Sequence, residues 1–134
     1  MMAFIFPIRV YYEDTDAGGV VYYANYLKFF ERARTEMLRA LGYEQSQLRN
    51  KEGIIFVIRS VQINYLRPAV FDDLLHVSAI VSHVKKASLI FEQTISRDNT
   101  LLCTGIIEVA CVQAENFRPC AIPNYLAEQL KNES

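Results

Sequence analysis

The chain has 134 residues, of which 51% are hydrophobic and 22% charged, and its formal net charge is −1. This length fits a single domain spanning residues 1–134, and the composition is globular rather than disordered. A net charge close to zero argues against nucleic acid as a partner, because phosphate-backbone binding needs a surplus of Lys and Arg. No apolar stretch approaches the ~20 residues of a membrane-spanning helix, and the opening MMAFIFPIRVYYE lacks the basic start and sustained apolar run of a secretory leader. We therefore expect a cytoplasmic protein without an integral membrane segment.

The first expected elements are a strand, a loop and a long helix. The run from Ala3 to Tyr12 is rich in aromatic and branched residues and predicts a strand. From Tyr22 to Leu41, apolar side chains recur at steps of three or four, which predicts one helix with a wide apolar stripe. Gly42 is placed to end this helix in a left-handed conformation.

The remainder of the chain changes to strand chemistry after a polar connector at residues 45–53. Strands are predicted at Ile54–Leu66, Leu74–Val84, Ser88–Arg97 and Leu101–Gln113. Breaker residues predict a loop at 67–73, and a short final helix is expected at 124–131 after Pro123. One strand, one helix and four further strands predict an α+β domain, in which an antiparallel five-stranded sheet wraps around a long central helix.

The segment that joins the first strand to the helix carries the residues best suited to chemistry. Residues 12–26 read YEDTDAGGVVYYANY. Asp16 offers a carboxylate, and Gly18 and Gly19 lack a Cβ, so a ligand can approach the main chain closely. A helix start also presents unpaired N–H groups and the positive end of the macrodipole, which stabilise an oxyanion. The pattern suits attack on a carbonyl group, although these residues equally fit an ordinary helix cap and turn.

A family resemblance favours the chemical interpretation. Residues 10–38, VYYEDTDAGGVVYYANYLKFFERARTEML, resemble the signature of the 4-hydroxybenzoyl-CoA thioesterase family of hotdog-fold proteins, and most closely its Tol-Pal-associated acyl-CoA thioesterase branch. Weaker similarity continues through residues 65–69 and 72–74. The resemblance implies a hotdog fold and an enzyme that hydrolyses an acyl-CoA thioester to the free acid and CoA. CoA is then part of the substrate, and no separate cofactor is expected.

The resemblance also implies roles for individual residues. In the family, the second acidic residue of the D-x-D-x-x-G pattern is the catalytic carboxylate, which is Asp16 here. The oxyanion donor is a backbone N–H in the first turn of the central helix, which falls on Tyr23. The branch commonly has His at this position. With Tyr23 in its place, the backbone N–H donor is kept but the imidazole is lost. The choice between general base and nucleophile for Asp16 stays open, as does that between aliphatic and aromatic acyl groups. Further substrate contacts are expected from Gly18, Gly19, Val20 and Tyr26.

Binding the CoA diphosphate requires cations near the mouth of the site. The candidates are Arg59, Arg67, Lys85 and Lys86. For Lys85 and Lys86, an ordinary soluble turn is the simpler interpretation. The cysteines at 103, 111 and 120 are too few and too widely spaced for a zinc motif, so we expect reduced thiols and no metal site.

Association is expected from strands that are apolar at nearly every position, such as IIFVI at 54–58 and GIIEVA at 105–110. Such runs imply burial on both faces, which a chain of this size meets most easily by forming a homodimer. The resemblance extends this to a dimer of dimers, with the acyl tunnel at a dimer interface. Two alternatives stay open: a hydratase or dehydratase, which would want a His near the motif, and an acyl-carrier-protein or acyl-group binding module with weak incidental thioesterase activity.

Overall fold

The computed structural model describes residues 3–133, so residues 1, 2 and 134 of the predicted domain lie outside the described range. The strands are β1 (Phe4–Arg9), β2 (Ile54–Tyr65), β3 (Leu74–Val84), β4 (Ser88–Arg97) and β5 (Thr100–Gln113). The helices are α1 (Asn25–Ala40), α2 (Gln45–Gln47) and α3 (Asn124–Glu133), with a 3-10 turn at Tyr12–Asp14 and a π-helical turn at Leu48–Glu52.

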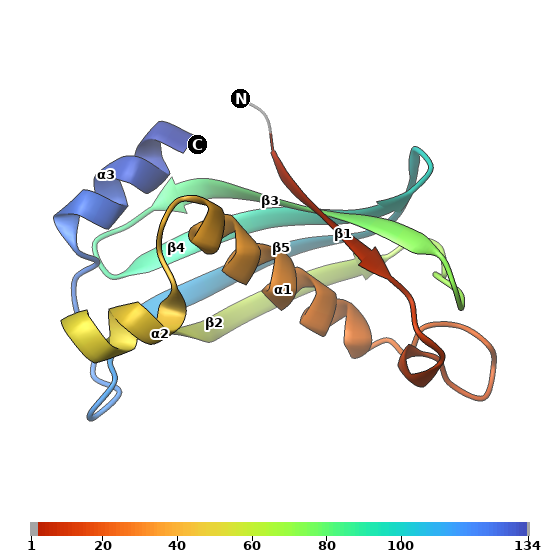
Figure 1. The fold of residues 1–134 in the computed structure, drawn as a ribbon, viewed down its shortest axis with the longest axis horizontal. Helices are drawn as coiled ribbons and strands as arrows, with labels where there is room; N and C mark the ends of the chain where they lie inside the picture. Colours follow the sequence, from red (N-terminus) through yellow and green to blue (C-terminus); the bar gives the residue numbers. More distant parts are fainter. Residues whose placement is uncertain (1–2, 134) are drawn as a thin grey trace.

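The strands form one antiparallel sheet in the order β1-β3-β4-β5-β2 (Figure 1). The predicted five-stranded antiparallel sheet is therefore confirmed, and the predicted strands at its centre agree closely with those observed. The first strand is shorter than predicted, because the chain leaves the sheet after Arg9. The N–H of Val10 donates to the carbonyl of Asp73, and residues 12–14 then form the 3-10 turn. β1 and β2 are the two edges of the sheet.

Helix α1 lies across one face of the sheet (Figure 1). Its predicted apolar stripe is confirmed, since one side of the helix buries Tyr26, Phe29, Phe30, Ala33, Met37 and Leu38. These side chains meet the inward-facing residues of the strands, which alternate with exposed ones as the two-residue period of a strand requires. The helix ends as predicted: Gly42 has φ +97°, and the N–H of Tyr43 donates to the carbonyl of Leu38.

Two segments depart from the prediction. Helix α1 begins at Asn25 rather than Tyr22, because the N–H of Tyr22 donates a hydrogen bond to the carbonyl of Asp14 at 2.9 Å and holds this residue in the preceding loop. The N–H of Asn25 donates to the carbonyl of Tyr22 at 2.8 Å, which closes a turn before the helix. The polar connector at 45–53 is helical, formed by α2 and the π-helical turn, and it ends at Gly53 with φ +68°.

The final helix is present as predicted and extends to Glu133. It lies at one end of the sheet and packs against β3, with Leu126 and Leu130 fully buried (Figure 1). Within residues 3–133, no helix combines the length and apolar character needed to cross a membrane.

Candidate active site

Asp14 holds the loop between β1 and α1 in shape. Its carboxylate accepts a hydrogen bond from the N–H of Tyr11 at 2.8 Å, which fixes the 3-10 turn. Its carbonyl accepts from the N–H of Tyr22 at 2.9 Å and from the side-chain amide of Asn25 at 2.8 Å. Asp14 therefore ties the beginning of the loop to the start of the helix. Its carboxylate is engaged in this structural role.

Asp16 stands at the tip of the same loop in a tight turn. Its Oδ1 accepts from the N–H of Gly18 at 2.8 Å, and its carbonyl accepts from the N–H of Gly19 at 3.0 Å. Gly19 has φ +80°, a conformation that residues with a Cβ rarely adopt. The N–H of Asp16 donates to the carbonyl of Val20 at 2.9 Å and closes the turn. The carboxylate is exposed, and its Oδ2 has no hydrogen-bond partner in the described part of the chain, so it is available to accept a proton or to attack a carbon.

The backbone just before α1 presents unpaired donors. Among the described residues, no acceptor faces the N–H of Tyr23 or that of Ala24, the residue that caps the helix start. The prediction that Tyr23 lies in the first turn of the helix is therefore wrong. The helix starts three residues later than predicted, so Tyr23 lies in the turn before it. The hydroxyl of Tyr65 donates to the carbonyl of Tyr23 at 3.0 Å and holds that peptide group in place. The N–H groups of Tyr23 and Ala24 therefore lie at the positive end of the helix macrodipole.

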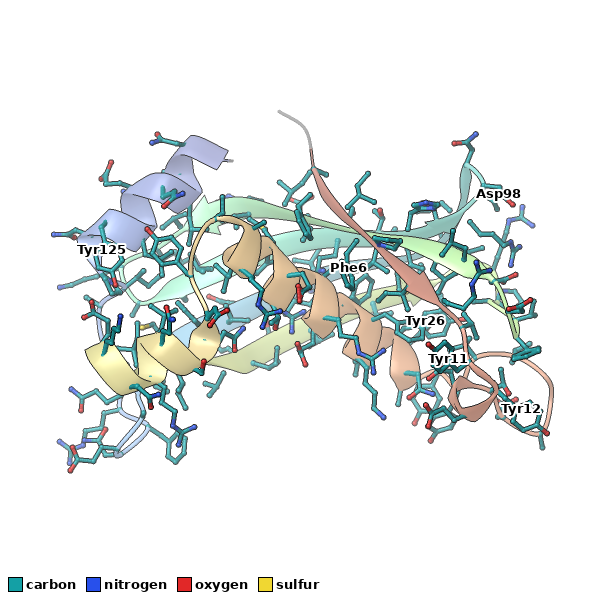
Figure 2. All side chains as sticks on the ribbon, in the orientation of Figure 1. Phe6, Tyr11, Tyr12, Tyr26, Asp98 and Tyr125 are labelled. Atoms are coloured by element: carbon teal, nitrogen blue, oxygen red, sulfur yellow. The ribbon has the colours of Figure 1, made fainter. Side chains whose placement is uncertain are left out.

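An aromatic cavity of about 280 Å³ adjoins these donors; its walls are Val21, Tyr23, Tyr26, Tyr65, Leu66, Arg67 and Pro68. Three of the predicted site residues, Tyr23, Tyr26 and Arg67, meet here. The rings of Tyr26 and Tyr65 pack edge to face with centroids 5.3 Å apart. Burial raises the pKa of Tyr26, whose hydroxyl accepts from the N–H of Ala69 at 3.0 Å. Figure 2 places Tyr26 at the same end of the molecule as Tyr11 and Tyr12, where the loop begins.

The loop at 67–73, predicted from its breaker residues, forms the other side of the site. The N–H of Val21 donates to the carbonyl of Ala69 at 2.8 Å, so the two loops are joined directly. The carboxylate of Asp73 accepts from the N–H of Val70 at 2.9 Å and from the guanidinium of Arg97 at 2.6 Å. Arg97 was not singled out from the sequence. It ends β4, 24 residues after Asp73, and nothing local links the two.

Within a single chain, the four predicted phosphate-binding cations do not lie together. Arg67 lines the cavity, whereas Lys85 and Lys86 lie in the turn between β3 and β4, at the end of the sheet opposite the Asp16 loop (Figure 1). Lys85 forms a 3.4 Å ion pair with Glu108. A hydrogen bond from Ser88, the Lys85 ammonium and the charge of Arg59 hold the pKa of the Glu108 carboxyl below its usual range, although burial opposes them. Only Arg67 is placed to meet a ligand in the cavity of its own chain.

No group of three His, Cys, Asp or Glu side chains within residues 3–133 is close enough to hold a metal ion. The candidate site combines the Asp16 carboxylate on its loop, the unpaired backbone donors into which this loop leads, and an aromatic cavity with one arginine, whose walls do not include Asp16. This set of groups suits acyl transfer from an ester or thioester, in which an oxyanion forms and a carboxylate assists attack.

Comparisons with known proteins identify the family of the chain. Residues 10–130 match the family model described as the thioesterase-like superfamily. The chain is 50% identical to the acyl-CoA thioesterase YbgC of Haemophilus influenzae over 120 residues, which cover 90% of this chain and 88% of the relative. It is 43% identical to the acyl-CoA thioester hydrolase YbgC of Escherichia coli over 129 residues, 96% of each protein. The crystal structure of a probable thioesterase from Bartonella henselae superposes with a TM-score of 0.87 at 39% identity, covering 91% of this chain and all of that one.

The chain belongs to the thioesterase-like superfamily. The resemblance stated from residues 10–38 is confirmed, as are the hotdog fold and the predicted class of enzyme, a thioesterase.

Proposed function

We propose that this chain hydrolyses acyl-CoA thioesters, with Asp16 as the catalytic carboxylate and the Tyr23 N–H as an oxyanion donor. One observation carries the proposal: a loop with an unpaired carboxylate oxygen leads directly into a helix start with unpaired N–H groups, beside an aromatic cavity. The two YbgC relatives, named for acyl-CoA thioester hydrolysis, support acyl-CoA as the substrate.

The reaction breaks the bond between the acyl carbon and the sulfur of CoA. In one route, Asp16 takes a proton from water as the water attacks the acyl carbon. In the other, a carboxylate oxygen of Asp16 attacks and forms an anhydride, which water then cleaves. In both routes the negative charge moves to the carbonyl oxygen, and the CoA thiolate leaves. The Tyr23 N–H stabilises that oxygen, and losing one such donor typically costs on the order of 3 kcal/mol.

We further propose that the working form is at least a homodimer built along β2, with a dimer of dimers as the expected tetramer. β2 is a 12-residue edge strand. Its register with β5 places Ile58, Val61 and Tyr65 opposite Val109, Ile107 and Cys103, all on the face that carries α1. In the single chain these three side chains are 51%, 39% and 48% exposed. A second copy would cover this apolar strip and extend the sheet edge to edge.

The direct test is Asp16→Asn, which keeps the shape of the side chain but removes the base. We expect kcat for acyl-CoA hydrolysis to fall by about 100-fold or more. Asp98→Asn is the matched control: Asp98 lies in the turn between β4 and β5, is exposed and has φ +50°, a conformation that Asn tolerates, so the activity of this variant should equal that of the parent. If Asp16→Asn hydrolysed acyl-CoA as fast as Asp98→Asn, the assignment of Asp16 would be wrong.

Two further measurements separate the remaining choices. Single-turnover hydrolysis in oxygen-18 water places the label in the product acid if water attacks the acyl carbon. Label found in Asp16 beside an unlabelled product acid shows instead that the carboxylate attacked and that water cleaved the anhydride at the Asp16 carbon. A thiol-release assay over aliphatic and aromatic acyl-CoA esters defines the acyl group. Run beside a binding measurement with acyl carrier protein, the same assay would favour a binding module if tight carrier binding accompanied negligible turnover.

A further inference from the structure

Two cysteines lie in contact at the end of the sheet remote from the candidate active site. The sulfur atoms of Cys111, in β5, and Cys120, in the segment that follows, are 3.6 Å apart. Cys111 is fully buried, and Cys120 is partly exposed. Among the three cysteines of the chain, these two alone contact one another in the structure described.

The backbone holds the pair in this position. The N–H of Cys120 donates to the carbonyl of Cys111 at 3.0 Å, and the N–H of Gln113 donates to the carbonyl of Arg118 at 2.8 Å. Val112 and Pro119 form an antiparallel bridge between them. The segment 118–120 therefore runs antiparallel to the end of β5, like the second strand of a short hairpin. The thiols are neighbours because of this pairing, so bond formation requires only local side-chain movement.

We propose that Cys111 and Cys120 form a reversible disulfide, which makes this pair a redox modification site. This inference does not depend on the proposed hydrolase activity. With hydrogen peroxide as oxidant, one thiolate attacks the peroxide, forming a sulfenic acid and releasing hydroxide, which takes up a proton to become water. The second thiol then attacks the sulfenic sulfur, the sulfur–sulfur bond forms and a second water leaves. Two electrons pass from the two sulfurs to the peroxide, and a dithiol reductant reverses the change.

The order of the steps follows from exposure. Burial raises the pKa of the Cys111 thiol to about 12, so at neutral pH this group is an uncharged thiol and a poor first nucleophile. Cys120 is the more accessible sulfur and is expected to react with the oxidant first. Cys103 is fully buried, its pKa is also raised to about 12 by burial, and its Sγ lies near the carbonyl of Thr104. We expect Cys103 to stay reduced.

The bond would tie the C-terminal segment to β5. It closes a loop that contains residues 112–119, and the N–H of Ile122, two residues beyond Cys120, already donates to the carbonyl of Lys86. Helix α3 follows and packs on β3. This region and the Asp16 loop lie at opposite ends of the sheet (Figure 1). The expected effect is therefore on the stability of the fold, with the candidate active site left intact.

The experiment treats the reduced full-length protein with graded hydrogen peroxide, then denatures it and blocks the remaining thiols with N-ethylmaleimide. Peptide mapping should recover a peptide pair joined through Cys111 and Cys120, with one maleimide on Cys103. The intact mass before blocking should fall by about 2 Da, since two hydrogen atoms are lost. The melting temperature should rise by about 5 °C or more in the oxidised form and return on reduction.

Cys120→Ser should abolish both the joined peptides and the rise in melting temperature, whereas Cys103→Ala should retain them. The mapping uses the parent protein, so the test does not depend on whether either variant folds. The proposal is overturned if both cysteines carry maleimide after peroxide treatment, if Cys120 gains oxygen without a cross-link, or if the cross-link joins two chains. A joined pair with an unchanged melting temperature would overturn the stabilising effect.

Discussion

Asp14 and Asp16 stand two residues apart and have different surroundings. Asp14 is half-buried, and its carboxylate and carbonyl accept hydrogen bonds from three groups that close the loop. The carboxylate of Asp16 accepts one hydrogen bond, from Gly18, and keeps an oxygen without a partner within residues 3–133. The first carboxylate therefore shapes the loop, and the second keeps a free oxygen, as the proposed chemistry requires. Spacing alone could not have separated these roles.

Gly18→Ala tests how closely the carboxylate of Asp16 must be held. A Cβ at this position would lie 3.2 Å from Oδ1 of Asp16, and Gly18 does not have a positive φ. We expect the carboxylate to be displaced by a few tenths of an ångström, and kcat to fall by about 10-fold or more because catalysis depends on position. The melting temperature should change little. Steady-state kinetics and a thermal melt of the same preparation check both expectations, and an unchanged kcat would contradict the first.

Gly19→Ala, in contrast, should act mainly on the stability of the protein. No atom lies within 4 Å of the added Cβ, but φ at Gly19 is +80°, where a side chain is strained. We expect a loss of about 1 kcal/mol in the free energy of unfolding, measured by urea denaturation. Gly18→Ala serves as the comparison, since it adds the same methyl group without backbone strain. Equal stability of the two variants would show that the turn relaxes.

Helix α1 is joined to the sheet by a buried polar contact between Arg34 and Gln93. The Nη1 of Arg34 donates to Oε1 of Gln93 at 2.9 Å, while Nε2 of Gln93 donates to the carbonyls of Phe30 and Ser78 at 3.0 and 3.1 Å. Arg34 is 8% exposed, and burial lowers its pKa to about 10. No carboxylate within the described residues forms an ion pair with it. Gln93 thus links the helix, β3 and β4 at one point.

Gln93→Met keeps the approximate volume but removes every one of these hydrogen bonds. The variant leaves the Arg34 cation buried without its acceptor, and two carbonyls lose a donor. We expect the free energy of unfolding to fall by about 3 kcal/mol, measured by urea denaturation. Glu92→Gln, on the exposed face of the same strand, should stay within about 0.5 kcal/mol of the parent. A Gln93→Met protein as stable as this control would show that water replaces the lost partners.

The single chain leaves one part of its sheet uncovered. Helix α1 covers the inner faces of β3, β4 and β5, whereas Ile58, Val61 and Tyr65 on the same face of β2 stay exposed. Tyr65, which contributes to both the exposed strip and the cavity, connects this uncovered region to the candidate active site. Assembly and catalysis are therefore expected to depend on each other.

Val61→Lys tests this dependence. A charge on the strip between Ile58 and Tyr65 should prevent burial of β2, so we expect monomers by sedimentation velocity and a loss of acyl-CoA hydrolysis. Ile106→Lys places the same charge on the opposite face of the sheet, where Ile106 is 46% exposed, and should keep at least the dimer. Val61→Lys that sedimented with the parent would exclude β2 as the interface. A monomer with full activity would show that the site is complete in one chain.

Much of the fold could be predicted from local patterns. The stripe from Tyr26 to Met37, the alternation along β3 to β5 and the glycine after α1 each follow from the geometry of a helix, a strand or a cap. The start of α1 could not, because it depends on hydrogen bonds between Asp14 and residues 22 and 25. The apolar periodicity extends back to Tyr22, but with the N–H of Tyr22 bonded to Asp14 the helix begins three residues later, at Asn25.

The candidate site likewise combines features that are local in sequence with contacts made across the sheet. Asp16 and the glycines after it act within five residues, so their order along the chain was enough to indicate a turn that presents a carboxylate ahead of a helix. The meeting of Tyr65 with Tyr23, of Arg97 with Asp73, and of Cys111 with Cys120 depends on strand order and register. Short-range preferences are encoded in neighbouring residues, whereas contacts across the sheet arise only when the whole core packs. For that reason the turn that carries Asp16 was foreseeable, whereas the walls of the nearby aromatic cavity were not.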